Sequence, residues 1–250
     1  MEYAFTVDHE DNEQQAFEAA KAYGKFQKYL SDFNLEDCHE TIPNFHNLSN
    51  RLERFNQTLQ TKSSERLEKA KLEINKVGEY KYLEDEFQNL LELNLPRRIT
   101  HNDTKINNVM LDKETKEGLC VLDLDTVMPG SILDDYGDMV RSFVSRAQED
   151  DRDYAKVEVR LNIFEAMTSG YLGELKDVLT FEEINNLVLG AKIIVYEQAI
   201  RFLTDFIEGD IYYKVDYQDH NLDRTKNQFA LLASIEDKSD EMKKIVDKYC

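Results

Sequence analysis

Residues 101–108 carry side chains whose types and spacing suit phosphoryl transfer. His101, Asp103, Lys105 and Asn108 stand in the order H-x-D-x-K-x-x-N, and Asp123 follows a short apolar segment. Enzymes that transfer phosphoryl groups arrange a carboxylate base, a cation and two oxygen ligands for a metal in such a layout. The spacing therefore predicts a site where Asp103 accepts a proton from a hydroxyl group and Lys105 meets phosphoryl oxygens.

Two β-prone runs are expected to position these residues. Val109–Asp112 and Leu119–Asp123 are apolar, and the polar stretch Lys113–Gly118 between them predicts a hairpin with a six-residue loop. In a hairpin without a bulge, Asn108 faces Asp123, with Cβ atoms about 4.5–5.5 Å apart. An amide oxygen and a carboxylate at that separation can share one Mg²⁺. A bulge in either strand would change this register.

The rest of the chain is predicted to be mostly helical. Helical periodicity marks the segments Glu13–Ser31, 48–59, Ser64–Leu93, Asp153–Ser169, Ile184–Glu208, Asn227–Glu236 and Ser239–Tyr249. Gly78 is placed to divide the third of these and Gly170 to end the fourth, while Thr180 and Glu183 form a capping box before the fifth. The predicted fold class is therefore α+β and mainly α-helical, with a small β-hairpin beside the candidate site.

A wider segment resembles a known family. THNDTKINNVMLD…VLDLDTVMPGSILDDYGDMVRS is similar to the aminoglycoside phosphotransferase and choline kinase family, and in particular to N-acetylhexosamine 1-kinases. Further similarity lies in the stretches YGKFQKYL (23–30), TIPNFHN (41–47), YEQAIRFLTDFIEGDIYY (196–213) and HNLDR (220–224). The resemblance implies a protein-kinase-like fold, ATP and Mg²⁺ as donor and metal, and phosphoryl transfer to the anomeric hydroxyl of N-acetylglucosamine or N-acetylgalactosamine.

The same resemblance implies roles for individual residues. It assigns catalysis to Asp103 and Lys105, metal binding to Asn108 and Asp123, contact with the substrate to Asp125, Arg201 and Tyr212, and a structural role to His101 and Asp135. Arg201 also stands four residues before Asp205, so an ion pair on one helix face is the structural alternative for it. For His46, a hydrogen-bonded structural role is favoured over contact with a substrate.

The chain departs from that family on its N-terminal side. The resemblance places a nucleotide-binding lobe with a phosphate-covering loop upstream, but the first glycine here is Gly24, the nine glycines are dispersed, and Met1–Asp8 is similar to the end of a hinge. We therefore expect residues 1–250 to form the C-terminal lobe of the kinase-like fold without the N-terminal lobe. Such a lobe should bind ATP poorly, be inactive alone, and expose an interlobe face through which two copies could form a homodimer.

Two functional hypotheses of different classes follow. The first is the catalytic lobe of an ATP-dependent sugar kinase, whose partner is a small-molecule sugar. The second is a non-catalytic binding or assembly protein that retains this lobe. The intact Asp103, Lys105, Asn108 and Asp123 favour the enzyme, since a scaffold needs no such set. A polar loop beside an ordinary hairpin remains the structural alternative for the motif.

Composition narrows the possible partners and the expected compartment. The formal net charge is −19, with 50 acidic and 31 basic residues, which disfavours binding to nucleic acids and to anionic membranes. No run of about 18 apolar residues predicts a membrane span, and the N-terminus lacks the order of a signal peptide. Three widely spaced cysteines, Cys38, Cys120 and Cys250, suggest reduced thiols. A cytoplasmic protein is therefore expected.

Overall fold

The computed structural model describes residues 4–6, 12–62 and 65–250. The α-helices are α1 (Glu13–Tyr29), α2 (Leu48–Thr61), α3 (Glu65–Lys69), α4 (Lys71–Glu79), α5 (Tyr82–Glu92), α6 (Ile132–Phe143), α7 (Leu161–Leu175), α8 (Phe181–Asn185), α9 (Leu187–Glu208), α10 (His220–Asp237) and α11 (Ser239–Lys248). The strands are β1 (Ala4–Phe5), β2 (Arg98–Thr100), β3 (Val109–Asp112), β4 (Gly118–Val121) and β5 (Met128–Gly130). Short 3₁₀ turns are η1 (Leu35–Asp37), η2 (Ile106–Asn108), η3 (Leu124–Thr126) and η4 (Tyr154–Lys156). The expectation of a mainly helical α+β fold is confirmed.

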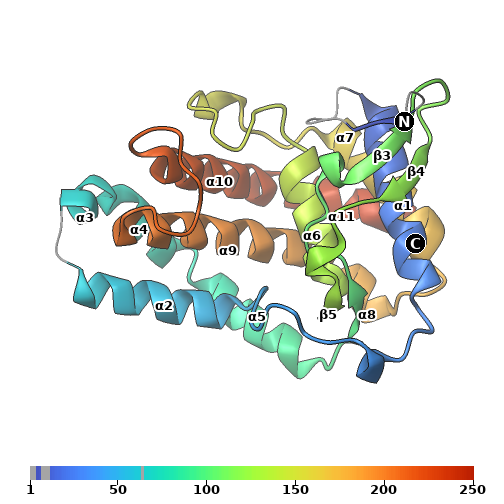
Figure 1. Cartoon of the computed structure of the whole chain (residues 1–250), viewed down its shortest axis with the longest axis horizontal. Helices are drawn as coiled ribbons and strands as arrows, with labels where there is room; N and C mark the ends of the chain where they lie inside the picture. Colours follow the sequence, from blue (N-terminus) through green and yellow to red (C-terminus); the bar gives the residue numbers. More distant parts are fainter. Residues whose placement is uncertain (1–3, 7–11, 63–64) are drawn as a thin grey trace.

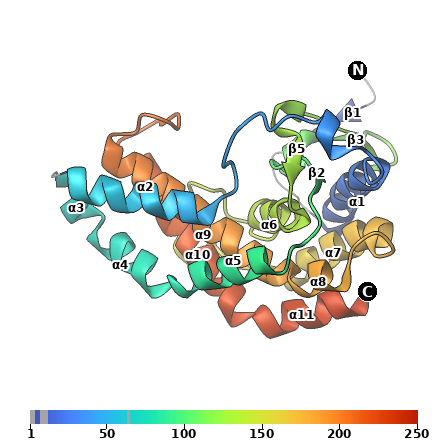
Figure 2. The same ribbon diagram turned by 90° about the horizontal axis from the view of Figure 1, so that it is seen from below.

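Helix α9 forms the centre of the molecule. It packs against α2, α6 and α10, which lie around it in Figure 1. Its buried positions occur on all sides of the helix rather than on one stripe, as expected for a helix enclosed by others. Helix α1 packs along α7, and Figure 2 shows α1 with strands β1 and β3 at the end of the molecule far from α3.

Two small antiparallel sheets flank the candidate site. Strand β3 lies between β1 and β4 in one sheet, and β2 pairs with β5 in the other. The chain runs from β2 through residues 101–108 into β3, so the polar segment connects the two sheets. The predicted hairpin is confirmed as β3 and β4. Residues 101–108, called the catalytic-type loop from here on, directly precede β3.

Several helix boundaries differ from the sequence prediction. The expected helix Ser64–Leu93 is three shorter helices, and the break between α4 and α5 falls at residues 80–81 rather than at Gly78. Gly170 does not end a helix but lies inside α7. A Cβ atom added there would come 2.3 Å from the Phe17 carbonyl oxygen, so this glycine permits α1 and α7 to pack closely. The predicted capping box of Thr180 and Glu183 is confirmed at the start of α8.

Another glycine permits α6 to approach α9, and it gives a test of the packing. A Cβ atom at Gly137 would lie 2.7 Å from Ile194 Cγ1 and 2.9 Å from the Gly190 carbonyl oxygen. We expect Gly137→Ala to lower the free energy of unfolding by about 1–3 kcal/mol, because the two helices must separate. The matched control is Gly78→Ala in α4, where the added methyl group meets nothing within 4 Å.

At Gly78 the better helix propensity of alanine should raise stability by about 0.5–1 kcal/mol. Urea denaturation of both variants measures the two changes. Equal effects of the two substitutions would contradict the close α6–α9 packing.

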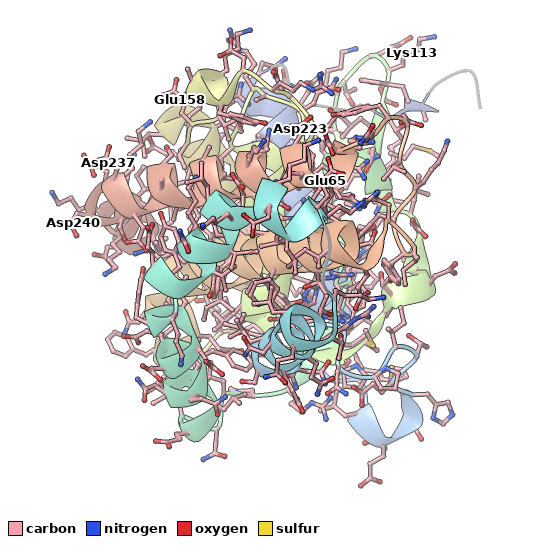
Figure 3. The ribbon with its side chains drawn as sticks, turned by 90° about the vertical axis from the view of Figure 1, so that its left-hand side faces the viewer. Glu65, Lys113, Glu158, Asp223, Asp237 and Asp240 are labelled. Carbon is pink, nitrogen blue, oxygen red and sulfur yellow. The ribbon has the colours of Figure 1, made fainter. Side chains whose placement is uncertain are left out.

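The acidic excess lies largely on the outside of the molecule. Glu65, Glu158, Asp237 and Asp240 are exposed, and Figure 3 shows the labelled Glu158, Asp237 and Asp240 on the rim, away from the helical core. Among the described residues, no helix combines the length and apolar character needed to cross a bilayer.

Candidate active site

One buried carboxylate, that of Asp135, binds the backbone of the catalytic-type loop. Asp135, near the start of α6, accepts hydrogen bonds from the backbone N–H groups of His101 at 2.9 Å and Asn102 at 2.6 Å. It also accepts a bond from the Gln27 side-chain amide at 2.5 Å. Ser131 and Asp134 form a capping box that starts α6. Helix α6 therefore begins where its first turn presents Asp135 to the loop.

Further hydrogen bonds fix the loop along its length. Three hydroxyl groups donate to backbone carbonyl oxygens, each at 2.7 Å. Thr104 donates to the carbonyl oxygen of Asp135. Tyr23 donates to the carbonyl oxygen of Lys105, and Thr126 donates to the carbonyl oxygen of His101. Asn102 has a positive φ of 65°, a conformation that asparagine tolerates better than most residues. The loop is thus held in one conformation by α1, α6 and η3.

The buried His101 connects the loop to Leu122, the residue directly after β4. Its Nε2 lies 2.8 Å from the Leu122 carbonyl oxygen, which can only accept, so Nε2 carries the proton. Its Nδ1 lies 3.3 Å from the backbone nitrogen of Asp103 and accepts from that N–H. The imidazole therefore supports Asp103 through the backbone and does not face a substrate.

Asp103, Lys105 and Asn108 lie in direct contact. Lys105 Nζ is 2.7 Å from Asp103 Oδ1, and Asn108 Nδ2 is 3.0 Å from Asp103 Oδ2. Burial and the charge of Arg141 lower the pKa of Lys105, but the charges of Asp103 and Asp138 outweigh them and raise it. Lys105 therefore stays a cation beside the carboxylate across the physiological pH range.

The predicted hairpin register is wrong by two residues next to the turn and by one residue beside Asn108, and a bulge lies between these two parts of the hairpin. Val109 pairs with Val121 and Met110 with Cys120, but Leu111 then pairs with Gly118. The Leu122 N–H donates to the Asn108 carbonyl oxygen at 2.7 Å, so Leu122, and not Asp123, stands opposite Asn108. The prediction of a regular hairpin fails because the Asp112 N–H donates to the Glu117 carbonyl oxygen, so Asp112 does not pair with Leu119 as predicted. Leu119, the extra residue of β4, restores one of the two residues of that shift.

Asp123 directly precedes η3, and Asp125 lies within it. Asp123 leaves the strand with a positive φ of 57°, and both aspartates are exposed. No three His, Cys, Asp or Glu side chains in the described ranges are grouped to hold a metal ion. The donor set of Asn108 and Asp123 is nevertheless of the oxygen type that Mg²⁺ prefers, because the Asn108 amide nitrogen donates to Asp103 and its oxygen remains an acceptor. The assignment of these two residues to a metal stays a prediction.

A cavity of about 410 Å³ opens beside the catalytic-type loop. Asp103 and Lys105 line it together with Arg201 and Tyr212, which come from α9 and the segment that follows it. Asn108, Asp123 and Asp125 do not line it. The fold therefore brings the predicted base, the cation and two of the predicted substrate-binding residues to one cavity, and leaves the predicted metal ligands outside.

Asp205 has other partners, so the structure does not support the alternative role of Arg201 as its ion-pair partner on one helix face. Asp205 accepts hydrogen bonds from the backbone N–H groups of Ile211, Tyr212 and Tyr213 at 2.8–3.0 Å, and so shapes the turn after α9. Arg201 donates instead to Gln198 Oε1 at 3.1 Å. Its guanidinium lies over two rings, 5.3 Å from the Phe45 centroid and 5.8 Å from the Tyr213 centroid.

Several lining residues were not identified from the sequence, and His46, for which a structural role was favoured over contact with a substrate, also lines the cavity. The residues not identified include Phe45, Asp138, Arg141, Glu149, Glu197, Gln198, Phe202 and Arg224. Arg141 pairs with Asp138 at 2.8 Å and also with Glu149. Arg141 and Lys105 outweigh burial and hold the pKa of Asp138 below its ordinary value. These residues come from separate segments whose local patterns carry no mark of a shared cavity.

Comparison with known proteins identifies a similar fold and a family. The structure is similar to that of an ethanolamine kinase from Plasmodium vivax, with a TM-score of 0.56 and 16% sequence identity, over 92% of this chain. The chain spans 62% of the length of that kinase. A likeness at this identity supports a kinase-like fold. A family model for the phosphotransferase enzyme family matches residues 4–162, a span that includes the loop, the hairpin and α6. The chain belongs to the phosphotransferase enzyme family.

Proposed function

We propose that the protein transfers the γ-phosphoryl group of ATP to a hydroxyl group of a small sugar, as an N-acetylhexosamine 1-kinase does. The observation that carries the proposal is the shared cavity: Asp103 and Lys105 line it together with Arg201 and Tyr212, from a distant part of the sequence. Its volume of about 410 Å³ lies in the range typical of small-molecule sites.

In the proposed reaction, Asp103 accepts the proton of the acceptor hydroxyl. The hydroxyl oxygen forms a bond to the γ-phosphorus of ATP while the bond from that phosphorus to the β–γ bridging oxygen breaks, and ADP leaves. The Lys105 ammonium, 2.7 Å from Asp103, is close enough to offset charge on the phosphoryl oxygens. Asn108 and Asp123 would hold Mg²⁺, which neutralises phosphate charge when it is bound.

The charges of the cavity favour a neutral acceptor over an amine. Each carboxylate among the described lining residues lies beside a basic group. The pairs are Asp103 with Lys105, Asp138 with Arg141, Glu149 with Arg141, and Glu197 with His46. A cationic acceptor such as ethanolamine would therefore find no unpaired carboxylate there. Sugar hydroxyls both donate and accept, so they can bind between such pairs without a net charge.

The aromatic side chains of the cavity support the same preference. Quaternary ammonium groups bind to open aromatic faces, but the rings of Phe45 and Tyr213 already contact the Arg201 guanidinium. Tyr212, 65% exposed, lies against Tyr213 in an edge-to-face contact. The guanidinium held over these two rings is available as a donor to oxygen atoms of an acceptor.

We also propose that these 250 residues supply the acceptor side of the reaction and need a nucleotide-binding lobe for turnover. The dispersed glycines offer no loop to cover the phosphates. Activity is therefore measured by ³¹P NMR on an enzyme that carries this chain together with such a lobe. Formation of a sugar 1-phosphate from N-acetylglucosamine or N-acetylgalactosamine supports the proposal. Phosphorylation of ethanolamine or choline, with none of the sugars, would overturn the choice of acceptor.

Binding of the acceptor can be tested on the 250-residue chain itself. We expect Arg201→Met to weaken N-acetylglucosamine binding by about 10- to 100-fold, because it removes a charged donor worth roughly 1.5–3 kcal/mol but keeps most of the side-chain length. Isothermal titration calorimetry measures the dissociation constant. The control is Arg146→Met, at an exposed arginine that does not line the cavity. Equal affinities for the Arg201 and Arg146 variants would remove Arg201 from the sugar site.

A further inference from the structure

His46 forms a bridge between the catalytic-type loop and the cavity wall formed by α9. It lies just before α2, and its side chain is 8% exposed. Its Nε2 is 3.1 Å from the Asn102 carbonyl oxygen, and its Nδ1 is 3.4 Å from Glu197 Oε1. The ring therefore lies between the residue that precedes Asp103 and the helix that carries Arg201.

The other polar groups of Asn102 are already bonded. Its N–H donates to Asp135, and its side-chain amide donates to the carbonyl oxygens of Thr100 and Thr126. The carbonyl oxygen is left for His46. Because the residue holds a positive φ of 65°, rotation of its peptide group would move the adjacent Asp103. The contact with His46 opposes that rotation.

We propose that His46 is a positioning residue, which holds Asn102 and thereby orients Asp103 toward an acceptor bound against α9. The catalytic consequence rests on the proposed function, whereas the structural link does not. Glu197 completes the bridge, since it adjoins Gln198 and lies on the same helix as Arg201, both in the cavity wall. Through these contacts, His46 links the position of Asp103 to α9, the helix that carries the proposed sugar-binding Arg201.

The charge state of the imidazole strengthens this link. Burial lowers the pKa of His46, but the interaction with the Glu197 carboxylate, 3.4 Å from Nδ1, outweighs burial and raises the pKa to about 9. The charge of Asp134 also raises the pKa of His46, and the charge of Arg201 lowers it. Arg51 Nε lies 3.8 Å from the same Glu197 oxygen that His46 faces. At neutral pH the ring is therefore protonated, so Nε2 donates to the Asn102 carbonyl oxygen and the charged Nδ1–H faces the Glu197 carboxylate at 3.4 Å. Above about pH 9 a neutral ring keeps only one donor, and the bridge weakens.

Amide hydrogen exchange in the 250-residue chain tests the link without any turnover. We expect His46→Leu to speed exchange at His101, Asn102 and Asp103 by at least tenfold, while amides in the middle of α10 keep their rates. His46→Gln, which retains a donor, should restore most of the protection. The control is His39→Leu, at an exposed histidine in the same segment. Unchanged exchange at the three loop amides in His46→Leu would overturn the proposal, whether or not the protein proves to be a kinase.

The pH dependence provides a second readout that a merely structural residue would not alter. NMR titration should show His46 losing its proton near pH 9. Glu197→Gln should lower the pKa of His46 by at least one unit, because burial still disfavours the charged ring and the carboxylate that stabilised it is gone. In the enzyme with its nucleotide-binding lobe, the alkaline fall of kcat should move by the same amount, with the KM for the acceptor changed less than threefold. A His46 titration at or below its ordinary value of about 6.5 would overturn the bridge.

Discussion

Replacing Asp103 with asparagine is expected to lower kcat by about 10²- to 10⁴-fold, the usual range for a positioned acid–base group. The amide is nearly the same size as the carboxylate but cannot accept the hydroxyl proton. It can still bond to Asn108 and remain beside Lys105, so the affinity for the acceptor should change much less. Steady-state kinetics with N-acetylglucosamine and MgATP, in the enzyme that carries the nucleotide-binding lobe, measures both parameters.

The control for this variant is Asp240→Asn, which makes the same chemical change at an exposed site on α11. Its kcat should match that of the unmodified enzyme. If Asp103→Asn retained full turnover, Asp103 would not be the base. If kcat and acceptor affinity both fell to the same degree, Asp103 would act mainly in binding.

Asp135→Ala is expected to lower the free energy of unfolding by about 3 kcal/mol or more. The substitution leaves the N–H groups of His101 and Asn102 buried without an acceptor, and each such group costs about 1–3 kcal/mol. It also removes the acceptor of the buried Gln27 amide. Because these bonds fix the loop before Asp103, the remaining folded protein should show faster exchange at the loop amides. Urea denaturation measures the loss of stability.

A graded series keeps this prediction testable even if the alanine variant folds poorly. Asp135→Asn retains one side-chain oxygen, so its loss of stability should be smaller than that of Asp135→Ala. Asp237→Ala is the control, because that side chain is exposed at the end of α10. Alanine variants of Asp135 and Asp237 with equal stability would show that the buried carboxylate does not hold the loop.

Local patterns determined the elements and the order of the reactive residues. The capping box of Thr180 and Glu183, the end of α9 at Glu208 and the apolar runs of β3 and β4 depend on neighbours along the chain, and each forms near its expected place. Spacing within residues 101–108 was sufficient to predict that Asp103 and Lys105 lie together, since few residues separate them.

Tertiary packing decided the rest. The register that sets Leu122 opposite Asn108, and the close approach of α1 to Gly170 within α7, depend on which surfaces meet. Arg201 and Tyr212 reach the cavity of Asp103 only because α9 passes beside the loop. No sequence spacing marked His46 as a link between Asn102 and Glu197, because these contacts join three separate segments. Short-range geometry follows from backbone propensities, whereas a cavity exists only after distant helices have packed.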